Sequence, residues 1–98
     1  MQISTKNENG KLTIFVSGRM DTVSAPELEQ AIKSNIDDAQ ELVLDLSEMS
    51  YTSSAGLRVL LVAHKLMSKK GGMTVTGVNE SVMEVLEITG FSDILDIK

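Results

Sequence analysis

The stretch LVLDLSEMSYTSSAGLRVLL, Leu42 to Leu61, passes from a strand pattern to a helix pattern. It begins within ELVLDLS, a short apolar run with polar flanks, which predicts a central strand buried on both faces. Beyond Thr52 the apolar spacing becomes helical. We expect a helix from about Ser54 to Lys69, closed by the two lysines and two glycines of residues 69–72. A strand that leads directly into a helix is typical of an α/β domain.

Two elements are expected before this stretch. Apolar and polar residues alternate on either side of Asn9-Gly10, which predicts a β-hairpin because this dipeptide readily adopts the positive φ angles of a tight turn. A helix is expected from about Ala25 to Ile36, with Ser24 and Glu27 at the spacing of a capping box and Pro26 in its first turn. Its buried face should carry Leu28, Ala31, Ile32 and Ile36.

The chain beyond Gly72 predicts one more strand and one more helix. MTVTGV, residues 73–78, reads as the strand, and Asn79 can cap a helix that runs to about Thr89 and ends at Gly90. The tail FSDILDIK predicts either a short strand or a short helix. The order β-β-α-β-α-β-α with a short C-terminal element predicts one α/β domain with a mixed sheet over residues 1–98.

The composition argues against several kinds of partner. The net charge of −5 and the aromatic content of 3% disfavour nucleic acid and anionic membranes. The apolar runs are shorter than the about 20 residues that span a bilayer. Because the N-terminus also lacks the pattern of a signal peptide, we expect a cytoplasmic protein. The absence of cysteine excludes disulfides, thiol catalysis and thiolate metal sites.

A serine near a glycine raises the question of nucleophilic catalysis. His64 is the one histidine of the chain, and it lies ten residues after Ser54. That spacing corresponds to roughly 15 Å along a helix, which is beyond the reach of a general base. We therefore expect His64 to be a surface residue. The sequence also lacks a nucleophile elbow, a phosphate-binding glycine loop and a calcium-loop spacing. We expect no catalytic residue, no metal site and no cofactor.

Ser54 at the start of the helix has two interpretations from its residue type. It can be the N-cap, or it can be a phosphorylation site. A phosphoryl group there would add about −1.5 to −2 charges beside the positive end of the helix dipole, where an anion is favourable. The fold should therefore tolerate the modification, and its effect would fall on a binding partner.

The faces of the same helix predict where a partner could bind. At about 100° per residue, a core-facing arc forms. It contains Val59, Leu60, Val62, Ala63, Leu66 and Met67. Leu57 and Leu61 fall between this arc and the polar face. They can pack under the preceding loop, or they can form a small apolar patch one turn from Ser54 that serves as a docking surface.

Four segments carry a family resemblance: SGRMDTVSAPEL, LVLDLSEMSYTSSAGLRVLL, GGMTVTGVNESVMEVLEITG and FSDIL. They resemble the STAS domain, in particular the small free-standing antagonists of anti-sigma factors. The resemblance covers essentially the whole chain. It implies a mixed sheet with helices packed mainly on one side, and a binding protein without a reaction of its own.

The resemblance also implies a partner-switching role in transcription regulation. The unphosphorylated antagonist would bind an anti-sigma factor that is also a serine kinase of the GHKL ATPase type, and so free a sigma factor. Phosphorylation would abolish this binding, and a PP2C-type phosphatase would reverse it. The alternative is a STAS scaffold module that sits in a larger assembly without phosphate cycling.

The resemblance assigns residues by their spacing to Gly56 and Leu57, which makes Ser54 the phosphoacceptor. Ser53 stands where many relatives have an aspartate and is the second choice. Asp21, in GRMD, matches a family aspartate near the phosphorylation site. The predicted partner-binding set is Asp21, Ser53, Gly56, Leu57 and Leu61.

Overall fold

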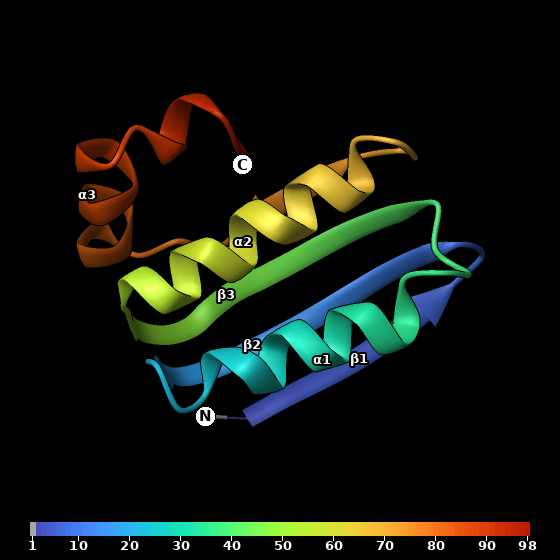
Figure 1. Ribbon diagram of the computed structural model, residues 1–98, viewed down its shortest axis with the longest axis horizontal. Coiled ribbons are helices and arrows are strands. Elements are labelled where there is room, and N and C mark those ends of the chain that lie inside the picture. The colour runs from blue at the N-terminus through green and yellow to red at the C-terminus, as the bar shows by residue number, and fades with distance from the viewer. Residues whose placement is uncertain (1) are drawn as a thin grey trace.

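A five-stranded mixed sheet carries three helices in the computed structural model, which describes residues 2–98 (Figure 1). In chain order the elements are β1 (Gln2–Glu8), β2 (Lys11–Met20), α1 (Ala25–Asn35), β3 (Glu41–Thr52), α2 (Ser54–Met67), β4 (Met73–Thr76), α3 (Glu80–Ile88), the 3₁₀ turn η1 (Phe91–Asp93) and β5 (Asp96–Ile97). The strands lie in the order β1-β2-β3-β4-β5. Strand β1 is antiparallel to β2, and the remaining neighbours are parallel, so the predicted element order and mixed sheet are confirmed.

The first hairpin turns at the predicted dipeptide. Asn9 has φ 52° and Gly10 has φ 85°, so both central residues occupy the left-handed region that a type I′ turn requires. Glu8 then pairs with Lys11, and this register fixes which side chains of β2 face the helices.

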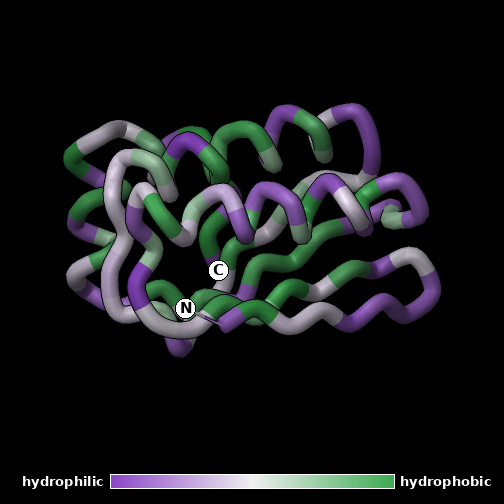
Figure 2. The backbone as a smooth tube through the Cα atoms, turned by 60° about the horizontal axis from the view of Figure 1, so that its bottom comes forward, coloured by the Kyte–Doolittle hydropathy of each residue, from purple (hydrophilic) through white to green (hydrophobic). Residues whose placement is uncertain are grey.

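The helices and the sheet form two layers. Helices α1 and α2 lie side by side over one face of the sheet, in front of β2 and β3 in Figure 1. In Figure 2 the same helices lie above the strands. The buried core lies between the layers and is built mainly from Leu12, Ile14, Val16, Leu28, Ile32, Leu42, Leu44, Leu46, Leu60, Ala63, Met67, Val75 and Leu86.

Strand β3 corrects one prediction. It extends to Thr52 and is not buried on both faces. Leu42, Leu44 and Leu46 face the helices and are buried, whereas Val43 and Asp45 on the opposite face are only half-buried. The physical reason is that α1 and α2 cover the same face of the sheet, so within residues 2–98 neither of these helices covers the other face. The polar ends of the apolar run belong to a strand with one exposed face.

The helix ends are partly as predicted. Asn79 caps α3 by accepting a hydrogen bond from the Val82 N–H at 2.8 Å, and Gly90 has φ 82°, as its role as the helix stop requires. Helix α2 ends at Met67, two residues before the predicted end, and Ser68 is its C-cap. The tail contains both predicted alternatives, the short helical turn η1 and the short strand β5.

Lys70 makes contacts that the sequence did not predict. Its ammonium donates to the backbone carbonyls of Ile36, Asp37 and Ala39 at 2.5, 3.1 and 2.9 Å. These carbonyls lie at and just beyond the C-terminus of α1, where a positive charge is favourable. Lys70 thereby joins the end of α2 to the end of α1.

Candidate functional site

The candidate site lies where the carboxyl ends of β2 and β3 meet. The two strands are parallel, and Met20 pairs with Thr52 at their ends. The Ser53 N–H donates to the Met20 carbonyl at 2.8 Å, which ties the start of α2 to the end of β2. Because each strand leads into a helix on the same face, the N-termini of α1 and α2 lie at one edge of the sheet (Figure 1). This arrangement brings the predicted Asp21 and serine segments together.

Asp21 forms a closed turn before α1. Its Oδ1 accepts hydrogen bonds from the backbone N–H groups of Val23 and Ser24 at 3.0 and 2.9 Å and lies 3.1 Å from the Ser24 hydroxyl. These contacts, the Ser24 backbone N–H first, then the Ser24 hydroxyl and the Val23 N–H, hold the pKa of Asp21 below its ordinary value. The carboxylate therefore fixes the conformation of the loop next to α2.

The same turn corrects the predicted capping box at Ser24. The Ser24 hydroxyl accepts from the Asp21 N–H at 2.9 Å and lies 3.0 Å from the Arg19 carbonyl, so it makes no bond to the first turn of α1. The Glu27 N–H donates to the Ser24 carbonyl instead, at 3.0 Å. The competing turn at Asp21 uses the hydroxyl that the capping box needed.

The two adjacent serines have different surroundings. Ser53 occupies the N-cap position of α2 with φ −101° and ψ 178°. Among the residues that the structure describes, its side chain makes no cap bond and its buried Oγ has no hydrogen-bond partner. Ser54 is the first helical residue and is exposed. The interpretation of Ser54 as the N-cap is therefore wrong by one position. Of the two serines, only Ser54 is an exposed residue.

Gly56 and Leu57 belong to the interior of the domain. A Cβ on Gly56 would lie 2.8 Å from the Met20 Sδ, and it would also collide with the Thr52 hydroxyl. Leu57 is 5% exposed and part of the core, so the alternative in which it packs inside is correct and Leu57 does not form an exposed patch. Leu61 is half-buried, and its role in partner binding stays a prediction.

The burial of Leu57 reflects the rotation of α2 about its axis. With Leu57 set at 0° and about 100° per residue, the buried residues run from Val59 near 200° through about 300° to Leu57 itself. The predicted arc is centred roughly 60° away from this one. Leu66, which the prediction placed in the core, is accordingly 38% exposed, and Val62 is half-buried.

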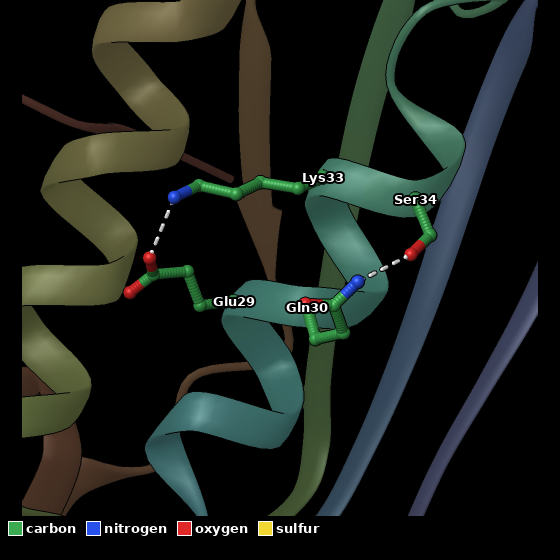
Figure 3. A network of polar contacts seen from close by, with 4 residues as sticks. All are labelled: Glu29, Gln30, Lys33 and Ser34. Atoms are coloured by element: carbon green, nitrogen blue, oxygen red, sulfur yellow. Dashed lines mark hydrogen bonds and ion pairs between the residues drawn. The ribbon is translucent and has the colours of Figure 1, made fainter.

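A groove of about 310 Å³ runs between the first turns of α1 and α2. Its lining includes Thr22, Glu29, Ser54 and Arg58. On the α1 side, the Glu29 carboxylate is paired with the Lys33 ammonium at 2.8 Å, and Figure 3 shows both side chains extending from α1 towards α2. The groove could not be read from the sequence, because its walls come from two helices whose relative placement only the fold determines.

The STAS domain profile matches residues 2–98. This chain belongs to the STAS domain family. The mixed α/β fold predicted from the sequence is also confirmed.

Two proteins similar to this chain are named as antagonists. The anti-sigma-B factor antagonist of Listeria monocytogenes is 33% identical over 95 residues, which cover 95% of this chain and 83% of the relative. The anti-sigma F factor antagonist of Paenibacillus polymyxa is 30% identical over 102 residues, which cover 99% of this chain and 86% of the relative. Neither name describes an enzyme.

Solved structures share this fold. The crystal structure of an anti-sigma factor antagonist from Mycobacterium paratuberculosis matches with a TM-score of 0.89 at 29% identity, covering 98% of this chain and 83% of that one. SpoIIAA in its unphosphorylated form matches with a TM-score of 0.78 at 11% identity over 99% of this chain and 87% of that one. The phosphorylated form of SpoIIAA matches with a TM-score of 0.77 at 12% identity, covering 99% of this chain and 91% of that one. At these identities the two SpoIIAA structures show the shared fold alone.

The remaining side chains of this STAS domain offer little for other chemistry. His64 is half-buried, and its buried Nδ1 has no hydrogen-bond partner among residues 2–98, so the prediction of a surface histidine is only partly correct. Residues 2–98 contain no group of three His, Asp or Glu side chains that could hold a metal ion. Within the same residues, no helix has both the length and the apolar character that crossing a bilayer would need.

Proposed function

We propose that this STAS domain is a phosphorylation-switched binding module. Its unphosphorylated form binds an anti-sigma factor that is also a serine kinase of the GHKL ATPase type. Binding frees a sigma factor, or another regulated output, and a PP2C-type phosphatase resets the phosphorylated form. The names of the relatives from Listeria monocytogenes and Paenibacillus polymyxa support this role. The domain catalyses no reaction itself and acts in the cytoplasm.

The observation that carries the proposal is the exposure of Ser54 at the first position of α2. A kinase must bring the γ-phosphate of ATP within bonding distance of the acceptor oxygen, which requires an accessible hydroxyl. The buried Oγ of Ser53 does not meet this requirement without opening the turn. Ser54 is therefore the acceptor, and the second choice, Ser53, is the weaker candidate.

The position of Ser54 also explains how a phosphate can act on binding without unfolding the domain. The first N–H groups of α2 have no side-chain cap from Ser53, and the helix dipole places partial positive charge there. A phosphoryl group of about −1.5 to −2 charges is therefore compatible with the helix start. The added charge changes the surface that a partner meets, in a chain whose net charge is already −5.

The test is phosphorylation followed by binding. The chain is incubated with ATP and the GHKL-type kinase encoded in the same genome, and the modified residue is located by mass spectrometry. We expect phosphate on Ser54, the same result with Ser53→Ala, and none with Ser54→Ala. In a pull-down with the same kinase, Ser54→Ala should bind and Ser54→Asp should bind weakly.

Two results would contradict the proposal. Phosphate found only away from Ser53 and Ser54 would remove the switch, and the non-cycling scaffold module would then be the better description. Equal binding of Ser54→Ala and Ser54→Asp would show that charge at this position does not control the partner.

A further inference from the structure

The groove beside Ser54 contains an arginine that has no partner within residues 2–98. Arg58 is exposed, and its guanidinium forms neither an ion pair nor a side-chain hydrogen bond there. The acidic residue across the groove, Glu29, is already paired with Lys33 on its own helix (Figure 3). Arg19, by contrast, lies over the ring of Tyr51 with its Cζ 4.5 Å from the ring centroid. The charge of Arg58 is therefore not neutralised by its surroundings.

Arg58 is placed one helical turn beyond Ser54. Residues four apart on a helix are surface neighbours, with Cβ atoms about 6 Å apart. With Leu57 at 0°, Ser54 lies near 60° and Arg58 near 100°, on the side of α2 opposite to its buried residues. Both residues line the same groove. An acidic group N-terminal to a basic group at this spacing is also the more favourable orientation on a helix.

We propose that Arg58 binds the phosphoryl group when Ser54 carries one. This inference rests on the proposed function of Ser54 and adds the residue that receives the phosphate. The planar guanidinium can donate two parallel hydrogen bonds to two phosphate oxygens, which a lysine cannot reproduce. The pair removes the cation of Arg58 from the exposed surface beside Ser54. Phosphorylation thus changes two surface groups at once: it adds a phosphate to Ser54, and it pairs the guanidinium of Arg58 with that phosphate.

The experiment introduces phosphoserine at position 54 of the full chain by amber-codon suppression, so that no kinase or partner is needed. The phosphate resonance is followed by ³¹P NMR between pH 4 and pH 8 to obtain the second pKa of the phosphoserine. Arg58→Gln should raise this pKa by about half a unit relative to the parent, because the dianion loses its counter-charge. The ¹⁵N–¹H signal of the Arg58 side-chain Nε should also shift on phosphorylation.

The matched control is Lys65→Gln, which removes the same charge from the same helix. Lys65 lies near 80° on α2 but eleven residues from Ser54, which is roughly 16 Å along the axis. Its replacement should move the phosphate pKa by less than about 0.2 units because solvent screens charges at that distance. Thermal denaturation of both variants checks that the fold is unchanged.

The outcomes separate this inference from the function on which it rests. Equal changes of the phosphate pKa in Arg58→Gln and Lys65→Gln, or no change in either, would overturn the contact between Arg58 and the phosphate while leaving Ser54 as an acceptor. The expected rise of the phosphate pKa in Arg58→Gln, together with no phosphorylation of Ser54 by the kinase, would support the contact between Arg58 and the phosphate and contradict the proposed function.

Discussion

Replacing Gly56 by alanine tests the packing that positions the start of α2. Gly56 lies in the first turn of the helix and is buried. A methyl group there would meet the Met20 Sδ at 2.8 Å and Cγ at 2.9 Å, and it would also meet the Thr52 hydroxyl. Met20 is 0% exposed and Thr52 is 4% exposed, so neither side chain has free space into which it can move.

Two opposing effects decide the sign of the change. Alanine is favoured over glycine inside a helix by about 1 kcal/mol. Inserting a methyl group into a packed interior costs about 1–3 kcal/mol, and here it meets atoms from two different strands. The difference is about 0–2 kcal/mol, and because the methyl group meets buried atoms of both strands we expect the upper half, so that Gly56→Ala lowers the free energy of unfolding by about 1–2 kcal/mol. For a domain of this size that corresponds to a fall in Tm of roughly 5–15 °C.

Urea unfolding followed by circular dichroism measures this change, and two further variants separate its parts. Ala55→Gly, at the neighbouring half-buried position, sets an upper limit on the helix-propensity term, because Ala55 also packs against the core. The Thr52→Ala background removes the nearest atom, so Gly56→Ala should cost less there. A rise in stability on Gly56→Ala, or an equal cost in both backgrounds, would refute the packing argument.

Three further perturbations follow from single contacts. Leu57→Ala should cost about 2–5 kcal/mol in urea unfolding because the side chain is buried, whereas Leu61→Ala should cost less and weaken kinase binding in a pull-down. Because its folded-state pKa is lowered, Asp21 stabilises the domain above its unfolded pKa of about 3.9. This stabilisation is lost as the pH falls through the folded value, so the advantage of the parent over Asp21→Asn in urea unfolding should shrink from pH 6 to pH 2. Lys70→Met should lower the free energy of unfolding by about 1–3 kcal/mol in thermal denaturation, because three carbonyls lose their donor. Lys69→Met, at an exposed neighbour without a side-chain hydrogen bond in residues 2–98, should have little effect.

The features that the sequence predicted are those fixed by local chemistry. The Asn9-Gly10 turn needs only two residues that tolerate positive φ, and the Asn79 cap needs only an acceptor three residues before an N–H. The hairpin register then places the alternating apolar residues of β2 on the face that meets the helices. The order of elements could be predicted because each element is also marked by residues close to it in the sequence.

The features that were missed depend on groups distant in the chain or on local competition. Ser24 has the spacing of a capping box, yet its hydroxyl is held by the turn at Asp21. Strand β3 has the composition of a doubly covered strand, but both neighbouring helices lie on one of its faces. Lys70 reaches the end of α1 through more than thirty intervening residues, as its contact with Asp37 shows. No periodicity within one element contains this information.

The rotation of α2 connects these corrections to the proposed switch. The close approach of Gly56 to Met20 and Thr52 sets which side of the helix meets the sheet. A turn of roughly 60° from the predicted orientation moves Leu57 into the core and leaves Ser54 and Arg58 facing outward. The glycine that the resemblance placed among the partner-binding residues therefore acts from the inside. It fixes the orientation in which Ser54 and Arg58, which share a face because they are four residues apart, are exposed, so a phosphate on the one can be bound by the other.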